Sequence, residues 1–329
     1  MIQLIYQPSE LDVDDTLILL LPEQLSTLES VAFKESCMQL LETNSLPATI
    51  VLDFRQNTFI SSSGLGALVT LYKATQKKGI ELILRNVTPQ AKMVLEMTQL
   101  DQILIIELSE QYGEIAIERL ENQLPETHPS VRSLGKRCLD IVGGIIGLGV
   151  TAIAFVPIAI AIKLDSPGPI LFRQVRCGWM GKQFRMWKFR SMYLNAEVLK
   201  SNVANQANGA IFKNDNDPRM TRVGRFLRQT SLDELPQFWN VVKGEMSLVG
   251  TRPPTPDEVE IYAVPEWQRL DVKPGMTGEW QVNGRSKVHN FDDIIKLDLR
   301  YQHNWSLVYD LKLIIKTIRV ILTNKSGGV

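Results

Sequence analysis

The chain has 329 residues, which is long enough for two domains. Residues 1–130 hold 18 acidic and 8 basic side chains, and residues 131–329 hold 18 acidic and 28 basic ones, so net charges of −10 and +10 cancel to zero. This division predicts an acidic soluble module joined to a basic module, and the basic module is expected to bind an anionic partner such as phosphate, lipid headgroups or nucleic acid.

The cysteine and histidine contents narrow the chemistry. Cys37, Cys138 and Cys177 are odd in number and far apart, so they predict neither a disulfide framework nor a zinc site and favour a reducing, cytosol-facing environment. Only three histidines are present, so a carboxylate is the expected general acid or base. The first ten residues lack the basic and apolar regions of a secretory signal, and we expect none.

The first 108 residues alternate between short apolar runs and helical patterns. The runs have the length of strands and lie at Thr16–Leu21, Thr49–Phe54, Ile80–Asn86 and Ile103–Glu107. The helical patterns between them lie at Gln24–Glu42, Leu65–Lys78 and Thr88–Leu100. This alternation predicts a small α/β domain with a mostly parallel sheet. The polar residues 109–131 then predict a helix and a linker.

A turn at Asn57–Gly66 leads from the second strand into a helix and places three serines beside the helix start. Backbone N–H groups there favour an anion, and a phosphorylated serine would add about two negative charges. The alternative is ordinary capping of the helix by Ser62 or Ser63. The strand, the turn and the segment SSSGLG resemble the STAS domain of anti-sigma-factor antagonists over residues 1–108. This resemblance implies that Ser63 is a phosphorylation site.

An apolar run of 22 residues without a charge, Ile141–Ile162, is long enough to span a bilayer. Pro157 removes a helical N–H inside it, so we expect the helix to kink or break there. The part before the proline, Ile141–Val156, would be about 24 Å long, which is short of a bilayer core. Basic residues flank the run on both sides, whereas a simple span favours them on one side. The pattern favours a re-entrant helix, with a span as the alternative.

Two further features concern helix packing and the membrane surface. Gly143 and Gly147 form a GxxxG pattern, which permits close approach of a second helix. Near the C-terminus one helical face is apolar and another is basic, which predicts a helix lying in the membrane interface. The apolar face consists of Leu307, Leu311, Ile314, Ile318 and Ile321, and the basic face of Lys312, Lys316 and Arg319. The alternative is an amphipathic helix packed on a domain core.

Two adjacent carboxylates, Asp233 and Glu234, follow a series of arginines and precede a further arginine site. The earlier arginines are Arg219, Arg222, Arg225 and Arg228, and the later site is Thr251-Arg252-Pro253-Pro254. A guanidinium binds phosphate through two hydrogen bonds, and a carboxylate can attack phosphorus or hold a metal ion. The residues therefore suit phosphate chemistry. The alternative is a capping box formed by Ser231 and Glu234 at a helix start.

Five motifs follow the apolar run in order. They lie at Asp165–Met192, at Asp217–Arg219 with Arg225–Arg228, and at Ser231–Pro236, Lys243–Arg252 and Lys273–Arg285. Together they resemble the monotopic polyprenyl-phosphate phosphoglycosyl transferases, called bacterial sugar transferases. The resemblance implies an α/β multi-domain chain with a STAS-like domain at 1–108 and a helix and linker at 109–131. A helix-rich α+β transferase domain would follow at 132–329, with a re-entrant membrane helix at 141–162 and interfacial amphipathic helices.

The resemblance also implies a reaction. The enzyme would transfer a sugar-1-phosphate from a UDP-sugar to polyprenyl (undecaprenyl) phosphate and release UMP. Asp233 would attack the β-phosphorus to form a covalent aspartyl–phosphosugar, and Glu234 would orient the site, hold metal or deprotonate the acceptor. A Mg²⁺ ion bound by Asp233 would neutralise the diphosphate. The reaction would initiate exopolysaccharide or other glycoconjugate assembly at the cytoplasmic face of a bacterial inner membrane.

The cationic residues and partners are assigned in the same way. Arg252 corresponds to the diphosphate-binding arginine of the family. Further candidates for substrate phosphates, with the lipid surface as their alternative partner, are Lys188, Arg190, Arg225 and Arg228. The expected partners are the UDP-sugar, polyprenyl phosphate, membrane lipids and a second copy in a homodimer, but not nucleic acid. The alternative function is a membrane-attached signalling or scaffold protein regulated through the STAS-like domain.

Overall fold

The computed structural model describes residues 16–43, 46–109, 128–283 and 290–323. Within 128–283 it leaves out residues 197, 200–202, 207–208, 211–213 and 215. Most of the predicted linker and the end of the motif at Lys273–Arg285 lie outside these residues. The chain divides into two compact units. The first contains residues 1–127 with the segments 180–182 and 262–271, and the second contains the remainder.

The first unit is built on a parallel sheet in the order β1-β3-β5-β6. The strands are β1 (Thr16–Leu20), β3 (Thr49–Asp53), β5 (Glu81–Val87) and β6 (Ile105–Leu108). Two short strands, β2 (Gln24–Leu25) and β4 (Phe59–Ile60), pair separately and were not predicted. With two residues each, they are too short to produce a recognisable apolar period.

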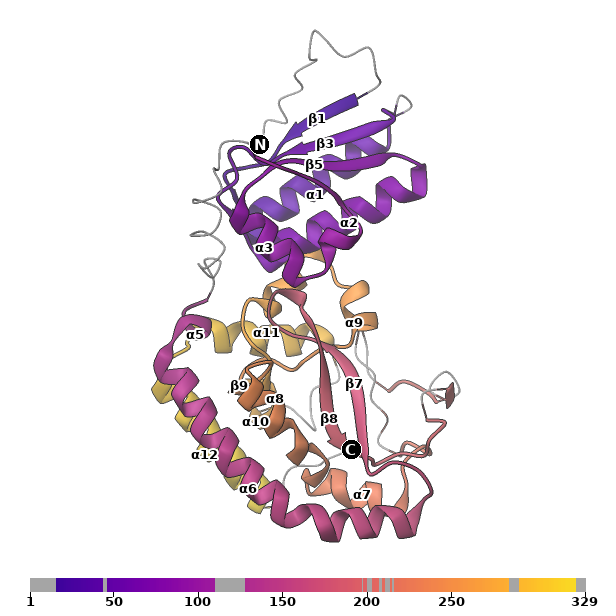
Figure 1. The fold of residues 1–329 in the computed structure, drawn as a ribbon, viewed down its shortest axis with the longest axis vertical. Coiled ribbons are helices and arrows are strands. Elements are labelled where there is room, and N and C mark those ends of the chain that lie inside the picture. Colours follow the sequence, from indigo (N-terminus) through magenta and orange to yellow (C-terminus); the bar gives the residue numbers. More distant parts are fainter. Residues whose placement is uncertain are drawn as a thin grey trace. The chain divides into compact units, whose positions relative to one another are not determined.

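Three α-helices and a short 3₁₀ turn connect these strands. They are α1 (Thr27–Leu41), α2 (Ser62–Lys78), α3 (Pro89–Met97) and η1 (Leu100–Gln102). Figure 1 shows α1 and α2 side by side against the sheet. Apolar side chains of the central strand, such as Val51 and Leu52, are almost fully buried, as are Phe33 of α1 and Leu68 of α2. In β3 both faces of the strand exclude water, whereas β5 alternates between buried and more exposed residues, so the apolar side of each strand packs inward.

A 3₁₀ helix from far along the chain, η5 (Val264–Leu270), belongs to the same unit. A Cβ atom added to Gly66 of α2 would lie 2.6 Å from the Trp267 ring, so only glycine permits this approach. Ser62 Oγ lies 2.6 Å from the carbonyl oxygen of Trp267 and 2.5 Å from a carboxylate oxygen of Asp271. Burial raises the pKa of Asp271, and hydrogen bonds from Ser62 partly oppose that shift.

The second unit begins with α5 (Pro129–Arg132) and the long helix α6 (Leu134–Asp165). The helix is continuous through Pro157, so the predicted break is wrong, although α6 bends along its length (Figure 1). Ile158 and Ile162, just beyond the proline, pack with Phe189 and Leu227 in a buried cluster. This burial offsets the hydrogen bond that Pro157 cannot donate.

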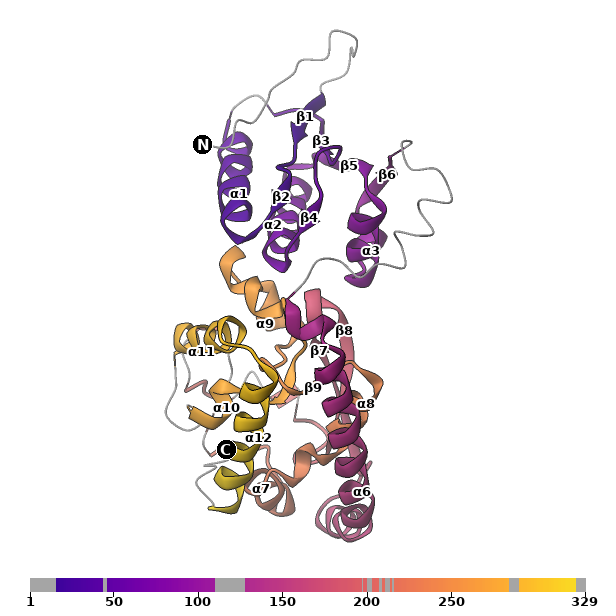
Figure 2. The same cartoon turned by 90° about the vertical axis from the view of Figure 1, so that its left-hand side faces the viewer.

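The chain between α6 and the C-terminus forms further elements. They are β7 (Leu171–Cys177), η2 (Trp179–Gly181), β8 (Gln183–Phe189), α7 (Arg222–Gln229), η4 (Leu232–Gln237), α8 (Phe238–Lys243), β9 (Ser247–Val249), α9 (Pro256–Glu260), β10 (Gly275–Thr277), α10 (Glu279–Asn283), α11 (Phe291–His303) and α12 (Leu307–Leu322). Of these, α7, η4, α8 and β9 contact α6, and η2 lies mainly in the first unit. Strands β7 and β8 form an antiparallel hairpin, and β9 and β10 pair in parallel. Figure 2 shows α6 and α12 with β9 between them.

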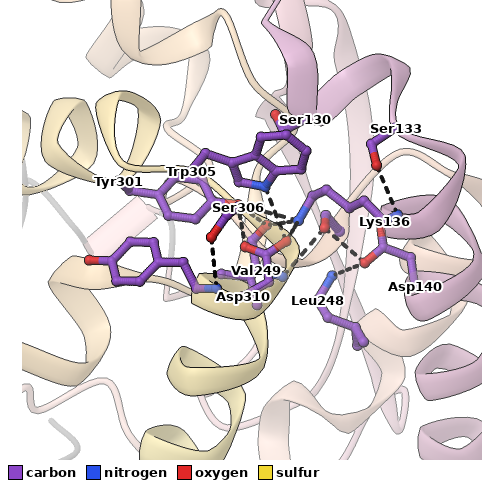
Figure 3. A network of polar contacts seen from close by, with 12 residues as sticks. Ser130, Ser133, Lys136, Asp140, Leu248, Val249, Tyr301, Trp305, Ser306 and Asp310 are labelled. Atoms are coloured by element: carbon purple, nitrogen blue, oxygen red, sulfur yellow. Dashed lines mark hydrogen bonds and ion pairs between the residues drawn. The ribbon is translucent and has the colours of Figure 1, made fainter.

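A buried polar network joins α6 to α12 (Figure 3). Lys136 of α6 donates to Asp310 of α12 at 2.6 Å and to the carbonyl oxygen of Val249 at 2.9 Å. The Tyr301 hydroxyl donates to the same carboxylate at 2.9 Å, and burial together with Asp310 raises the pKa of Tyr301 well above 10. One turn further along α6, Asp140 accepts from Ser247 Oγ and from the backbone N–H of Leu248. The network fixes both helices to β9.

Candidate functional site

The carboxylate pair lies on the 3₁₀ helix η4, directly after Ser231 in a left-handed conformation with φ of 57°. The Ser231 side chain makes no capping hydrogen bond, so the predicted capping box does not form. Successive residues of a 3₁₀ helix point about 120° apart. Asp233 is accordingly buried, with 3% of its surface exposed, whereas the Glu234 side chain is 25% exposed and lies 3.2 Å from Lys188 Nζ.

Contacts with α6 and α8 hold η4 in place. The Thr151 hydroxyl on α6 lies 3.1 Å from the carbonyl oxygen of Leu235. A Cβ atom on Gly147 would lie 2.3 Å from the Phe238 ring, and one on Gly143 would lie 2.5 Å from Leu248. The GxxxG pattern of α6 therefore permits the close packing that was predicted for it.

The arginine site after β9 is held by an acidic partner that the sequence did not reveal. The guanidinium of Arg252 donates to both carboxylate oxygens of Glu258, at 2.7 and 3.1 Å. Burial alone would raise the pKa of Glu258, but Arg252 and Arg176 hold it below its usual value of 4.5. Arg176 also donates to the carbonyl oxygen of Pro253. The segment that follows β9 thus carries an oriented guanidinium.

The other predicted cations have different surroundings. The guanidinium of Arg190 is 5% exposed and donates to the carbonyl oxygens of Ser166 and Pro167, so it closes the turn after α6. Arg228 donates to Ser191 Oγ at 3.1 Å, and Arg225 is exposed on α7. Of the predicted phosphate-binding residues, the structure brings Lys188 and Arg252 together at one cavity.

This cavity has a volume of about 740 Å³ and lies within the second unit. Charged and polar residues at one part of its wall are Arg176, Lys188, Ser231, Glu234, Gln237 and Arg252. Apolar positions of α6 and α12 supply much of the rest: Gly143, Ile146, Gly147, Val150, Ile314, Ile318, Val320 and Ile321. Asp233 is not among the described residues that line it. The cavity combines cationic and polar side chains with an apolar wall.

The sequence predicts Asp233 as the Mg²⁺ ligand, with metal binding as one of the roles considered for Glu234. Among the described residues, no group of three or more His, Cys, Asp or Glu side chains could hold a metal ion. Mg²⁺ commonly takes one or two protein carboxylates and completes its octahedral shell with substrate phosphates and water. Glu234 lines the cavity and can supply one such carboxylate, whereas Asp233 is buried and does not line it.

The serine segment of the first unit is closed to solvent. Ser61, and neither Ser62 nor Ser63, caps α2 by accepting from the N–H of Gly64 at 3.1 Å. Ser62 and Ser63 are fully buried, and Ser63 Oγ lies 3.4 Å from Thr27 Oγ1. Phosphorylation of Ser63 therefore requires this segment to open.

Two helices of the second unit expose apolar side chains. In the described part of the chain, α6 is the one helix long and apolar enough to cross a membrane, and only 22% of its most apolar window is buried. Its exposed side chains include Val142, Ile145, Ile146, Val150, Ile153, Val156 and Ile160. On α12 the exposed apolar residues include Leu307, Val308, Leu311, Ile315, Ile318 and Ile321. Such contiguous apolar surface marks a binding or membrane-contacting face.

Sequence reasoning did not single out several residues of the site. Arg176 is one of the basic residues that follow the apolar run and was given no role, and Glu258 carried no motif of its own. Trp280 and Gln281 line the cavity from α10, within the motif at Lys273–Arg285. The available signal was that motif itself, whose polar and aromatic residues were given no individual role.

Comparison with known proteins identifies both parts of the chain. Residues 131–324 match the family described as "Bacterial sugar transferase", and residues 9–113 match the family described as "STAS domain". These ranges place the two resemblances seen in the sequence on separate segments.

Three curated relatives match the second part. The galactosyl transferase CpsE of Streptococcus agalactiae is 51% identical over 194 residues, which are 57% of this chain and 42% of the relative. The undecaprenyl-phosphate galactose phosphotransferase of Salmonella typhimurium is 43% identical over 215 residues, which are 64% of this chain and 44% of the relative. The exopolysaccharide production protein ExoY of Sinorhizobium fredii is 36% identical over 213 residues, 62% of this chain and 94% of the relative. The chain spans less than half the length of the first two.

Proposed function

Because the chain belongs to the bacterial sugar transferase family and also carries a STAS domain, we propose that it transfers a sugar-1-phosphate from a UDP-sugar to a polyprenyl phosphate such as undecaprenyl phosphate. The product would be a polyprenyl-diphosphate sugar, the first lipid-linked intermediate of an exopolysaccharide or similar glycoconjugate. A relative of matching sequence is named as an undecaprenyl-phosphate galactose phosphotransferase, so UDP-galactose is the first donor to test.

The cavity is the observation that carries this proposal. Its cations, Arg176, Lys188 and Arg252, suit the phosphates of both substrates. Its apolar wall between α6 and α12 suits the isoprenoid tail of the acceptor, which offers only hydrocarbon. A lipid phosphate has both parts in one molecule. A site for a soluble substrate alone would have no use for an apolar wall that continues onto exposed helices.

The proposed reaction has two displacements. A carboxylate oxygen of Asp233 forms a bond to the β-phosphorus, and the bond from that phosphorus to the oxygen bridging the two phosphates breaks, so UMP leaves with the electron pair. A phosphate oxygen of the acceptor then attacks the same phosphorus and releases the Asp233 carboxylate. Lys188 and Arg252 would stabilise the charge on the transferring group, and Mg²⁺, when bound by the carboxylates, would neutralise the diphosphate.

The membrane arrangement is part of the same proposal. The apolar surface of α6, its bend and the basic residues at both of its ends support a re-entrant helix at the cytoplasmic face of a bacterial inner membrane. The apolar side of α12 would lie in the interface, with its lysines near anionic headgroups. Both helices would then present the cavity to an acceptor that never leaves the bilayer.

The test compares the two carboxylates. We expect Asp233→Asn to abolish UMP release and the sugar-phosphate adduct seen by intact-mass spectrometry after incubation with UDP-galactose and Mg²⁺. Glu234→Gln should slow turnover but still accumulate the adduct, because the nucleophile remains. An adduct on the Asp233→Asn protein would show that Asp233 is not the nucleophile and would favour Glu234 in that role. A parent chain that releases no UMP with any UDP-sugar would favour the signalling or scaffold alternative.

A further inference from the structure

Two buried polar atoms in the cavity wall have no hydrogen-bond partner. They are the indole N–H of Trp280 and the amide oxygen of Gln281, neighbouring residues on α10 that both line the cavity. Buried polar atoms are nearly always paired, because leaving one unpaired costs free energy. Two residues that line one cavity and carry, respectively, an unpaired donor and an unpaired acceptor therefore indicate a ligand that supplies the missing partners.

Gln281 lies near the oriented arginine. A Cβ atom added to Gly278 would lie 3.0 Å from the amide oxygen of Gln281 and 2.1 Å from the carbonyl oxygen of Gly250. Gly250 ends β9 and precedes Thr251 and Arg252 directly. The amide oxygen is thus close to the backbone that carries the proposed phosphate-binding guanidinium.

The helix that carries both side chains is fixed in position. Glu279 accepts a hydrogen bond of 2.7 Å from the Tyr309 hydroxyl, and Thr277 and Thr317 share one of 2.6 Å. Lys316 also pairs with Asn283 at the end of α10. These contacts tie α10 and the end of β10 to α12 on both sides of Trp280 and Gln281. The unpaired atoms therefore belong to a rigid wall, which is what a recognition site requires.

The chemistry of the two atoms selects among the parts of the proposed substrates. The phosphates are anionic and suit the cations of the cavity rather than an amide oxygen, which would repel them. The isoprenoid tail has no polar atom to offer. The uncharged part of a UDP-sugar has both kinds of group: the uracil ring has an N–H and two carbonyl oxygens, and each sugar hydroxyl donates and accepts.

We propose that Trp280 and Gln281 recognise the uncharged part of the nucleotide sugar, with the indole N–H donating to an oxygen and the Gln281 oxygen accepting from an N–H or O–H. This inference rests on the proposed function, because it assumes that the cavity receives a UDP-sugar. It assigns recognition residues to a reaction in which the carboxylates and cations handle only the phosphates.

The test uses variants that remove one polar group and leave an apolar side chain in its place. Trp280→Phe removes the indole N–H and retains an aromatic ring, and Gln281→Leu removes the amide. We expect each to raise the KM for UDP-galactose about 3- to 10-fold, the loss of one neutral hydrogen bond, with the KM for polyprenyl phosphate unchanged. Trp239→Phe and Gln183→Leu are matched controls, because both residues are exposed and neither lines the cavity.

Inhibition by UMP and the preference among UDP-sugars distinguish whether Trp280 and Gln281 bind the uracil ring or the sugar. If the variants also weaken inhibition by UMP, the pair reads uracil. If UMP inhibition is unchanged while the preference among UDP-galactose, UDP-glucose and UDP-N-acetylgalactosamine shifts, the pair reads a sugar hydroxyl. Either result supports the proposal. A KM for UDP-galactose equal to the parent's in both variants, or a rise confined to polyprenyl phosphate, would overturn it.

The failure of the proposed function would look different. A parent chain that releases no UMP would refute the reaction but leave recognition open to measurement. Calorimetric titration of UDP-galactose into the parent chain and both variants, in detergent micelles, then decides the matter. Weaker binding by the variants supports recognition by this pair, and equal or absent binding contradicts it.

Discussion

Asp233 and Glu234 are neighbours in sequence with different surroundings. The left-handed Ser231 turns the chain into η4, and the 3₁₀ geometry then directs Asp233 inward and Glu234 to the cavity. A buried carboxylate beside a partly exposed, lysine-paired one gives the two residues separate roles in the proposed reaction. In the proposed reaction the β-phosphorus has to reach Asp233. Because Asp233 is buried, its side chain would have to become accessible before the first displacement.

The pair formed by Lys136 and Asp310 is the most buried ion pair of the second unit among the described residues, with side chains 5% and 0% exposed. Buried charges are costly to leave alone, so removing one partner destabilises far more than removing both. Figure 3 shows that Asp310 also accepts hydrogen bonds from Tyr301 and Trp305, and that Lys136 also donates to the Val249 carbonyl oxygen. We therefore expect strong coupling between the two charges.

A double-mutant cycle measures that coupling. Lys136→Met and Asp310→Leu should each lower the free energy of unfolding by about 3–5 kcal/mol, because each leaves a buried charge without its partner. The double variant should lose clearly less than the sum of the two. Denaturant unfolding of the full chain in micelles, followed by tryptophan fluorescence, gives all four values. Strict additivity would show that the charges are not coupled.

At the scale of elements, α6 is a packing surface as well as a long apolar helix. Its glycines bring Phe238, Val242 and Leu248 against the helix backbone. The same face receives η4 through Thr151 and Leu235. The position of the carboxylates therefore depends on how closely α8 and η4 approach α6.

Two glycines of α6 provide a matched comparison. Gly147→Ala places a Cβ atom 2.3 Å from the Phe238 ring, so we expect the free energy of unfolding to fall by about 1–3 kcal/mol. Because η4 must then shift, we also expect less of the sugar-phosphate adduct. Gly149→Ala meets nothing within 4 Å and should leave the unfolding free energy unchanged or raise it by about 0.5–1 kcal/mol. Denaturant unfolding and intact-mass spectra report both effects. Equal behaviour of the two variants would contradict the packing argument.

At the scale of the whole molecule, the length of α6 no longer decides its topology. Because the helix continues through Pro157, its 32 residues would extend about 48 Å if straight, which exceeds a bilayer core. The re-entrant proposal therefore rests on the bend and on the basic residues at both ends. Lys136, an obvious position for a cysteine probe, is buried in the ion pair and unsuitable.

Leu134 and Leu164 are suitable positions for cysteine probes, because they are 82% and 84% exposed at opposite ends of α6. In a chain with Cys138→Ser, single Leu134→Cys and Leu164→Cys variants should react with a membrane-impermeant maleimide from the same side of sealed vesicles. Cys37 and Cys177 are buried and provide the unreactive background. Labelling from opposite sides would establish a span.

Local patterns predicted much of the fold. The four long strands of the first unit were predicted to within two residues at each end. Alternation and apolar runs suffice for such elements because they depend on near neighbours. The two-residue strands β2 and β4 were missed, since their pairing depends on contacts more than 30 residues apart.

Local residue patterns were sufficient to predict the two-part organisation, the apolar helix, the carboxylate pair and the arginine that follows it. Each of these features depends on residue types close together in the chain. Only the tertiary structure decided which carboxylate faces the cavity, that Arg190 closes a turn, and that the helix continues through Pro157. These outcomes depend on burial and on partners from distant segments. A side chain's surroundings follow from how elements pack, and packing is not encoded at any single position.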